Sequence, residues 1–168
     1  APLHAPDEIY RAIVQHIKDD PLSMGALVTT HKIDLLNACR DLFDYLDPYA
    51  QICNEVSCIS KVDGKLHGYA KDPISSSLTM QHFIPDGYWQ QFGGDVLCLG
   101  AGGAAIAITV YLAEQSKTGD YPDRFILVDI SQERLDAIQQ IHTKLDTPIQ
   151  FDYHLTDNAA DNDSLMAN

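Results

Sequence analysis

Basic residues are scarce in this chain. It has 11 Lys and Arg against 24 Asp and Glu, which gives a formal net charge of −13. Nucleic acids and anionic membranes are bound through basic surface, so we expect neither as a partner. No apolar run reaches the roughly 20 residues that a transmembrane helix needs, and no signal peptide is visible. The hydrophobic content of 45% predicts a globular protein with a substantial core.

Paired cysteines are also missing. The four cysteines, Cys39, Cys53, Cys58 and Cys98, form no C-x-x-C pair. We expect isolated thiols in apolar surroundings, and neither a disulfide framework nor a metal site. Such thiols are typical of a reducing cytosol, so the predicted location is cytoplasmic. The chain begins at Ala1 and not at Met, which predicts that it is processed, trimmed or a fragment.

The first half of the chain alternates helical and strand patterns. Apolar residues at helical spacing predict three helical stretches, over residues 7–19, 33–46 and, with a break near Pro85, 74–92. Strands are predicted over residues 26–30, 51–60 and 66–70, the last two joined by a hairpin turn at 62–65. This half is therefore predicted to be a small α/β unit.

The character of the sequence changes at Gly93-Gly94. A buried strand, a glycine turn and a long apolar helix follow, then a second strand, a second helix and the third strand IQFDYH. This β-α-β-α-β order predicts a parallel sheet with right-handed crossovers. The tail, residues 156–168, carries no strong structural signal.

The glycine turn LGAGGAA fits the dinucleotide fingerprint G-x-G-x-x-A. Gly100 allows the tight turn, Gly102 lets the backbone approach a pyrophosphate, and Ala105 keeps the helix close to the sheet. Because the helix N-terminus presents unpaired N–H groups, it can hold the phosphates without basic side chains. The predicted cofactor contacts here are Gly100, Ala101, Gly102, Gly103 and Ala104.

The next strand ends in Asp129, where an acidic side chain holds the two hydroxyls of an adenosine ribose. The following residue is Ile130 and not a cation, and Asp129 would repel a 2′-phosphate, so we predict NAD over NADP. NADP stays open. S-adenosylmethionine is a rival ligand, since methyltransferases also place an acidic residue at this strand end. A glycine-rich turn in some other α/β fold is the remaining alternative.

Several polar motifs of the first half precede this fold in a particular order. They are Val28-Thr29-Thr30-His31-Lys32, Val56-Ser57-Cys58, and Asp63-Gly64-Lys65-Leu66-His67-Gly68-Tyr69-Ala70-Lys71-Asp72. Together with the glycine turn, they resemble the shikimate dehydrogenase family, including its quinate/shikimate members. The family pattern runs N-V-T-x-P-x-K, G-A-V-N-T, D-G-K-L-x-G-Y-N-T-D and V-L-G-A-G-G-A-A-x-A. The resemblance covers residues 7 to about 145.

The resemblance implies an incomplete substrate-binding α/β domain over residues 1–92 and an incomplete Rossmann-type NAD(P)-binding domain over residues 93–168. It implies NAD(P)-dependent interconversion of a cyclic hydroxy-acid alcohol and its ketone, shikimate-like or quinate-like. Lys32 and Asp72 fall on the family's catalytic pair. Thr29 and Ser57 fall on positions that bind the small-molecule substrate. A homodimer is left open.

The chain also departs from the family pattern in its first half. The loop from Thr29 to Lys32 lacks the proline and is one residue shorter, and Ser57-Cys58 stands in place of Asn-Thr. Ala70-Lys71 replaces the Asn-Thr before the aspartate. The departures concern the substrate half, so two alternatives are kept. One is a non-enzymatic or regulatory nucleotide-binding protein with an altered pocket, and the other is a methyltransferase.

Overall fold

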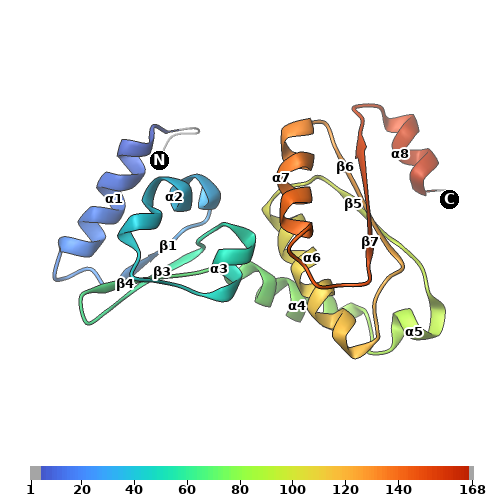
Figure 1. The fold of residues 1–168 in the computed structure, drawn as a ribbon, viewed down its shortest axis with the longest axis horizontal. Helices are drawn as coiled ribbons and strands as arrows, with labels where there is room; N and C mark the ends of the chain where they lie inside the picture. The colour runs from blue at the N-terminus through green and yellow to red at the C-terminus, as the bar shows by residue number, and fades with distance from the viewer. Residues whose placement is uncertain (1–4, 167–168) are drawn as a thin grey trace. The chain divides into compact units, whose positions relative to one another are not determined.

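The computed structural model describes residues 5–166, and the chain divides into two compact units between Asp72 and Pro73 (Figure 1). Each unit is a layer of helices packed on its own sheet, so the predicted α/β class is confirmed. Within the described range, no helix is long and apolar enough to cross a membrane. No disulfide joins the four cysteines there, and no group of His, Cys, Asp and Glu side chains could hold a metal ion.

The first unit has a four-stranded sheet in the order β1-β3-β4-β2. Its strands are β1 (Gly25–Leu27), β2 (Tyr45–Leu46), β3 (Cys58–Val62) and β4 (Lys65–Tyr69). The β1–β3 and β3–β4 pairs are antiparallel, whereas β2 lies parallel to β4. The predicted hairpin turn joins β3 and β4, with Asp63 and Gly64 both at positive φ.

Two helices cover this sheet, α1 (Asp7–Asp19) and α2 (Lys32–Cys39). Tyr10, Val14 and Ile17 recur at helical spacing, and they are the buried residues of α1. They join Leu35 and Leu36 of α2 in one hydrophobic core. The predicted helix over 7–19 is confirmed.

The second unit has a parallel sheet in the order β5-β6-β7. Its strands are β5 (Val96–Leu99), β6 (Arg124–Asp129) and β7 (Gln150–Leu155), and the helices α6 (Gly103–Gln115) and α7 (Gln132–His142) lie together on one side of the sheet (Figure 1). Phe125 and Leu127 are completely buried, as expected of the central strand. The predicted β-α-β-α-β order is confirmed.

Residues 73–92 belong to the second unit by packing. They form most of α4 (Asp72–Phe83), which begins at the last residue of the first unit, and α5 (Tyr88–Phe92). The buried Asp120 carboxylate accepts hydrogen bonds from the backbone N–H groups of Gly87 and Gln90, at 2.8 and 3.0 Å. The predicted division at residues 92 and 93 concerns ligand binding and not packing, so it stays a prediction.

The predicted helix over 33–46 is wrong beyond Cys39. The chain turns through a short 3₁₀ helix, η1 (Arg40–Leu42), and then pairs with β4. Asp44 makes this switch: its backbone N–H donates to the Leu66 carbonyl at 2.8 Å, and its carboxylate accepts from the Leu66 N–H at 2.9 Å. For the residues after Cys39, pairing with the sheet edge is therefore more favourable than continuing the helix that the spacing of apolar residues predicts.

Three further predictions need correction. The predicted strand over 51–60 begins only at Cys58, because residues 48–53 form α3 (Pro48–Cys53). Asp47 caps this helix by accepting from the Ala50 N–H at 2.7 Å, and Pro48 occupies its first position. The polar tail contains α8 (Ala159–Met166), which no sequence pattern indicates, and the predicted strand over 26–30 ends early at Leu27.

Candidate active site

Lys32 and Asp72 form an ion pair within the first unit, although 40 residues separate them in the chain. Lys32 Nζ donates a hydrogen bond to Asp72 Oδ2. The two side chains are 18% and 32% exposed, so the pair is half-buried and still reachable by a small molecule. The structure therefore brings together the two residues predicted to be catalytic.

Both residues of the pair lie at the first position of a helix. Lys32 is the first residue of α2 and follows His31, whose left-handed backbone (φ 57°) turns the chain from β1 into the helix. The Lys32 carbonyl also accepts from the Val56 N–H at 3.4 Å, which ties this turn to the segment before β3. Asp72 begins α4, where a carboxylate is stabilised by the helix dipole.

The two predicted substrate-binding residues have different surroundings. Thr29 lies exposed in the loop between β1 and α2. Ser57 is buried, and its Oγ accepts from the Lys71 N–H at 2.7 Å and lies 3.3 Å from the Tyr69 carbonyl, to which it donates. The Ser57 hydroxyl thus fixes the backbone just before Asp72. The substrate-binding roles of Thr29 and Ser57 stay predictions.

Glu55 is a neighbour of the pair that the sequence did not single out. It is only 2% exposed, and its Oε1 atom has no hydrogen-bond partner in the described part of the chain. Burial raises the pKa of Glu55 from its ordinary 4.5 to about 7, the negative charge of Asp72 adds to the rise, and Lys32 opposes it. A charged residue is expected to face solvent, which is why no sequence pattern indicates Glu55.

The glycine turn lies at the start of α6 in the second unit. Gly100 has φ +106°, a conformation that favours glycine, and its N–H donates to the Val128 carbonyl at 2.7 Å. Gly102 caps α6, and a Cβ atom there would meet nothing within 4 Å in the described chain. Gly102 and Ala104 are exposed and Gly103 is half-buried, so the first turn of α6 is open to solvent. This arrangement fits a pyrophosphate.

Asp129 ends β6 beside this turn and is 6% exposed. Its carboxylate accepts from the N–H groups of Ala101, at 2.7 Å, and Ser131, at 2.8 Å. Burial alone would raise the pKa of Asp129, but these hydrogen bonds, with Arg134, outweigh it and lower the pKa. Ile130 is exposed.

Arg134 is a second residue that the sequence prediction missed. Its Nη1 lies 4.0 Å from Asp129 Oδ2, and its side chain is 66% exposed. The prediction of NAD over NADP depends on the position directly after Asp129, whereas the first turn of α7 brings Arg134 back to the same place. A cavity of about 220 Å³ at this end of the sheet is lined by Gly100, Asp129, Ile130 and Arg134, among others.

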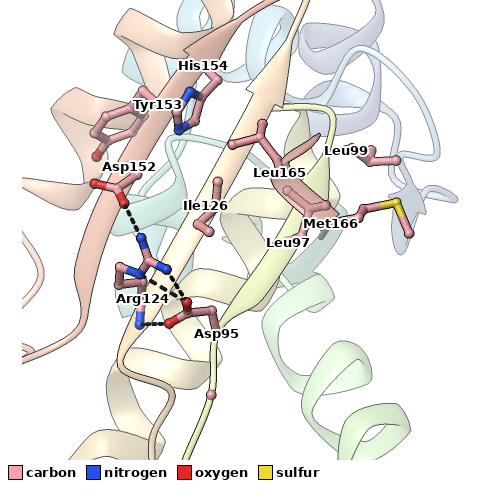
Figure 2. Close-up of a pocket in the computed structure, with 11 residues that line it drawn as sticks. Asp95, Leu97, Leu99, Arg124, Ile126, Asp152, Tyr153, His154, Leu165 and Met166 are labelled. Carbon is pink, nitrogen blue, oxygen red and sulfur yellow. Dashed lines mark hydrogen bonds and ion pairs between the residues drawn. The ribbon is translucent and has the colours of Figure 1, made fainter. Parts of the chain in front are cut away.

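A larger cavity, of about 940 Å³, lies elsewhere, against the middle of the second sheet. Figure 2 shows Leu97 and Ile126 on its wall, with Leu165 and Met166 of α8 opposite. Its cation, Arg124, is already paired with Asp95 at 2.6 Å and Asp152 at 3.7 Å. Because its cation is already paired with two carboxylates, this cavity is a poor candidate for catalysis.

Comparison with known proteins gives the same family as the sequence motifs. The shikimate dehydrogenase (NADP(+)) of Bacillus cereus (strain AH187) is 32% identical over 108 residues, which are 64% of this chain and 36% of that protein. A solved shikimate dehydrogenase in complex with NADP+ is 26% identical and has a TM-score of 0.66, covering 89% of this chain and 48% of its own. The chain is similar to the shikimate dehydrogenases.

The predicted resemblance to the shikimate dehydrogenase family and its fold is thereby confirmed. The chain spans less than half the length of both of these relatives. The 5-ketofructose reductase of Gluconobacter sp. strain CHM43 is also similar, with 26% identity, a TM-score of 0.59, and coverage of 86% of this chain and 47% of that one. No protein-family model matches the chain.

Proposed function

We propose that this chain belongs to an NAD(P)-dependent oxidoreductase that interconverts a cyclic hydroxy-acid alcohol, shikimate-like or quinate-like, and its ketone. The observation that carries the proposal is the half-buried ion pair of Lys32 and Asp72. An isolated surface ion pair contributes little stability, so stability alone gives weak reason to place one in a partly desolvated position. Similarity to the shikimate dehydrogenases adds support.

Lys32 moves the proton in the proposed reaction. In alcohol oxidation, the neutral amine of Lys32 accepts the proton of the substrate hydroxyl, and in ketone reduction the ammonium returns it. Asp72 accepts a hydrogen bond from Lys32 Nζ and so holds the nitrogen in place. The bound nicotinamide supplies the hydride acceptor or donor.

The second unit provides the proposed cofactor site. The N–H groups at the start of α6, from Gly103 and Ala104, bind the pyrophosphate, and Asp129 binds the ribose hydroxyls. We propose NAD as the favoured cofactor, because the Asp129 carboxylate is ionised and would repel a 2′-phosphate. Arg134 is the feature that opposes this choice, since an exposed guanidinium at 4.0 Å from Asp129 could meet that phosphate.

Calorimetric titration with NAD and NADP tests this choice. Tighter binding of NADP would contradict it. Arg134→Ala identifies the cause, because it should weaken only NADP if the guanidinium binds the 2′-phosphate. Lys117→Ala, which removes a cation in the 3₁₀ turn after α6, is the matched control.

The reaction is tested with a substrate panel and NAD on the full-length protein. We expect oxidation of shikimate, quinate or a related cyclic hydroxy acid. Cofactor binding with no turnover on any member of the panel would favour the alternative of a non-enzymatic nucleotide-binding protein. Binding of S-adenosylmethionine and not of NAD would favour a methyltransferase.

Two observations support a second candidate class of substrate, a sugar ketone. The similar 5-ketofructose reductase acts, by its name, on a sugar ketone, and this chain has Ser57 and Ala70 where the shikimate dehydrogenase pattern has asparagines. The panel therefore includes 5-ketofructose with NADH and NADPH. Reduction of the sugar ketone without reaction of shikimate or quinate would replace the cyclic hydroxy acid in the proposal and keep the roles of Lys32 and Asp72.

A further inference from the structure

Glu55 lies between α3 and β3 in an environment that opposes its charge. The side chain is 2% exposed, and its Oε1 has no hydrogen-bond partner among the described residues. A buried carboxylate without hydrogen bonds destabilises a fold, whereas the protonated acid costs much less.

The charges that act on Glu55 are those of the proposed catalytic pair. Asp72, at the start of α4, disfavours ionisation of Glu55, and Lys32, at the start of α2, favours it. The backbone brings them together: the Val56 N–H, next to Glu55, donates to the Lys32 carbonyl at 3.4 Å. The Glu55 N–H donates to the Ala50 carbonyl at 3.3 Å, which fixes the other side of the turn. No other charged group of the described chain contributes.

We propose that Glu55 is a positioning residue of the Lys32–Asp72 pair, a third ionisable group that competes with Asp72 for the lysine ammonium when it loses its proton. In its protonated form, Glu55 leaves the ammonium to Asp72 alone. In its ionised form, it stabilises the charged form of Lys32 and so disfavours the neutral amine that accepts the hydroxyl proton. Alcohol oxidation therefore slows as Glu55 ionises.

The coupling itself can be measured without turnover. Carbon-13 NMR of the glutamate carboxyls, with the Glu55 resonance assigned by its loss in Glu55→Gln, should give a midpoint near 7 in the wild-type chain. Asp72→Asn should lower the pKa of Glu55 and Lys32→Met should raise it, each by about half a pKa unit or more. Asp44→Asn, which removes a carboxylate paired with Lys18, should leave it unchanged.

If Glu55 had a merely structural role, the two variants would not shift its pKa in opposite directions. A Glu55 midpoint in the ordinary acidic range, or one that neither Asp72→Asn nor Lys32→Met moves, overturns the proposal. If one of the two variants does not fold, the sign of the shift in the other decides. This experiment does not depend on the proposed reaction, so a protein without dehydrogenase activity still tests the coupling.

The consequence for turnover rests on the proposed function. Above pH 7, Glu55→Gln and Glu55→Ala should oxidise the substrate about 3- to 10-fold faster than wild type, as expected for about half to one pKa unit of coupling, and should lose the ionisation near pH 7 from the profile of kcat/KM. Below that pH, the rates should converge. Asp120→Asn, which removes a buried carboxylate in the second unit, is the control and should keep the wild-type profile. An unchanged profile in both Glu55 variants contradicts the catalytic part of the proposal.

Discussion

Glu55 of the first unit and His142 of the second are both buried titratable side chains with strongly shifted pKa values, and their hydrogen bonding differs greatly. In the second unit, burial lowers the pKa of His142 to about 4. Its Nδ1 lies 2.8 Å from the Tyr153 hydroxyl and its Nε2 lies 3.1 Å from Thr109 Oγ1, while the ring stacks on Phe151 with centroids 3.9 Å apart. In the first unit, Glu55 has an Oε1 atom with no hydrogen-bond partner among the described residues.

We interpret the difference as one between structural burial and burial with the proposed positioning role. His142 has a partner for both ring nitrogens, as a structural polar group in a packed core should. Glu55 is held beside two charges and without a full set of partners, an arrangement that native proteins retain mainly where function requires it. A shifted pKa alone would have ranked the two residues equally, and their hydrogen bonds distinguish them.

The largest expected effect concerns the pair beside Glu55. Lys32→Ala should reduce turnover by roughly 100- to 10,000-fold, because the proposed proton acceptor is lost, and should leave cofactor binding nearly unchanged. Steady-state kinetics and a calorimetric titration measure the two. Lys18→Ala, which removes a similarly exposed lysine paired with Asp44, is the control and should retain activity. Full turnover of Lys32→Ala would remove Lys32 from the mechanism.

The corresponding change in the second unit should affect stability. His142→Ala removes a stacked ring and its hydrogen bonds with the Tyr153 and Thr109 hydroxyls, so the free energy of unfolding should fall by about 2–4 kcal/mol. Urea denaturation at neutral pH measures it. His16→Ala, on the exposed side of α1, should change the stability by less than about 0.5 kcal/mol. Equal effects of the two substitutions would show that the hydrogen bonds of His142 contribute nothing.

His142 and Glu55 should make the free energy of unfolding depend on pH in opposite directions. The pKa of His142 is lower in the folded protein, so the unfolded chain binds more protons between about pH 4 and 6.5, and stability rises with pH in that window. The pKa of Glu55 is higher in the folded protein, so stability falls as pH rises from 4.5 to about 7. Each contribution is at most about 3 kcal/mol.

Urea midpoints measured across this range check both signs. His142→Phe should lose the rise with pH, and Glu55→Gln should lose the fall. If Glu55→Gln follows the wild-type curve throughout, Glu55 does not change its ionisation on folding, and the contrast between the units disappears.

The smallest effect compares the helix caps of the two units. Asp47 accepts from the Ala50 N–H at 2.7 Å and from the Ala70 N–H at 3.2 Å, whereas Ser131 accepts from the Arg134 N–H at 3.4 Å. Asp47→Ala should therefore cost about 1–2 kcal/mol of stability and Ser131→Ala about 0.5 kcal/mol. Thermal unfolding of the two variants tests the order, and a larger loss in Ser131→Ala would contradict it.

Local signals explain what the sequence could predict. The glycine turn at Gly100 and the strand ending in Asp129 depend on neighbours in the chain, so their structure follows from their pattern. The segments around Asp44 and Asp47 were mispredicted because a sheet edge and a helix cap compete there with apolar spacing. Asp47-Pro48 did carry a helix-start signal that should have outweighed the strand interpretation.

The residues of the candidate site also separate into those that could be predicted from the sequence and those that could not. Lys32 and Asp72 were identified through the resemblance to a family, and their meeting over 40 residues of chain is not deducible from spacing. Glu55 and Arg134 were missed because each owes its place to tertiary packing or to a helical turn. No sequence rule predicts a buried carboxyl without a hydrogen-bond partner, because hydrogen-bond partners are known only once the chain is folded.

The bonding of Asp129 has a practical consequence for anyone who redesigns this protein. One of its oxygens holds Ala101 in the glycine turn, and the other holds Ser131 at the start of α7, so a single carboxylate fastens two loops. Exchanging Asp129 to admit a different nucleotide at the proposed cofactor site would also loosen the turn that we propose binds the phosphates. If Asp129 sets the nucleotide preference as proposed, that preference is coupled to the order of both loops, and a redesign must supply a substitute for both hydrogen bonds.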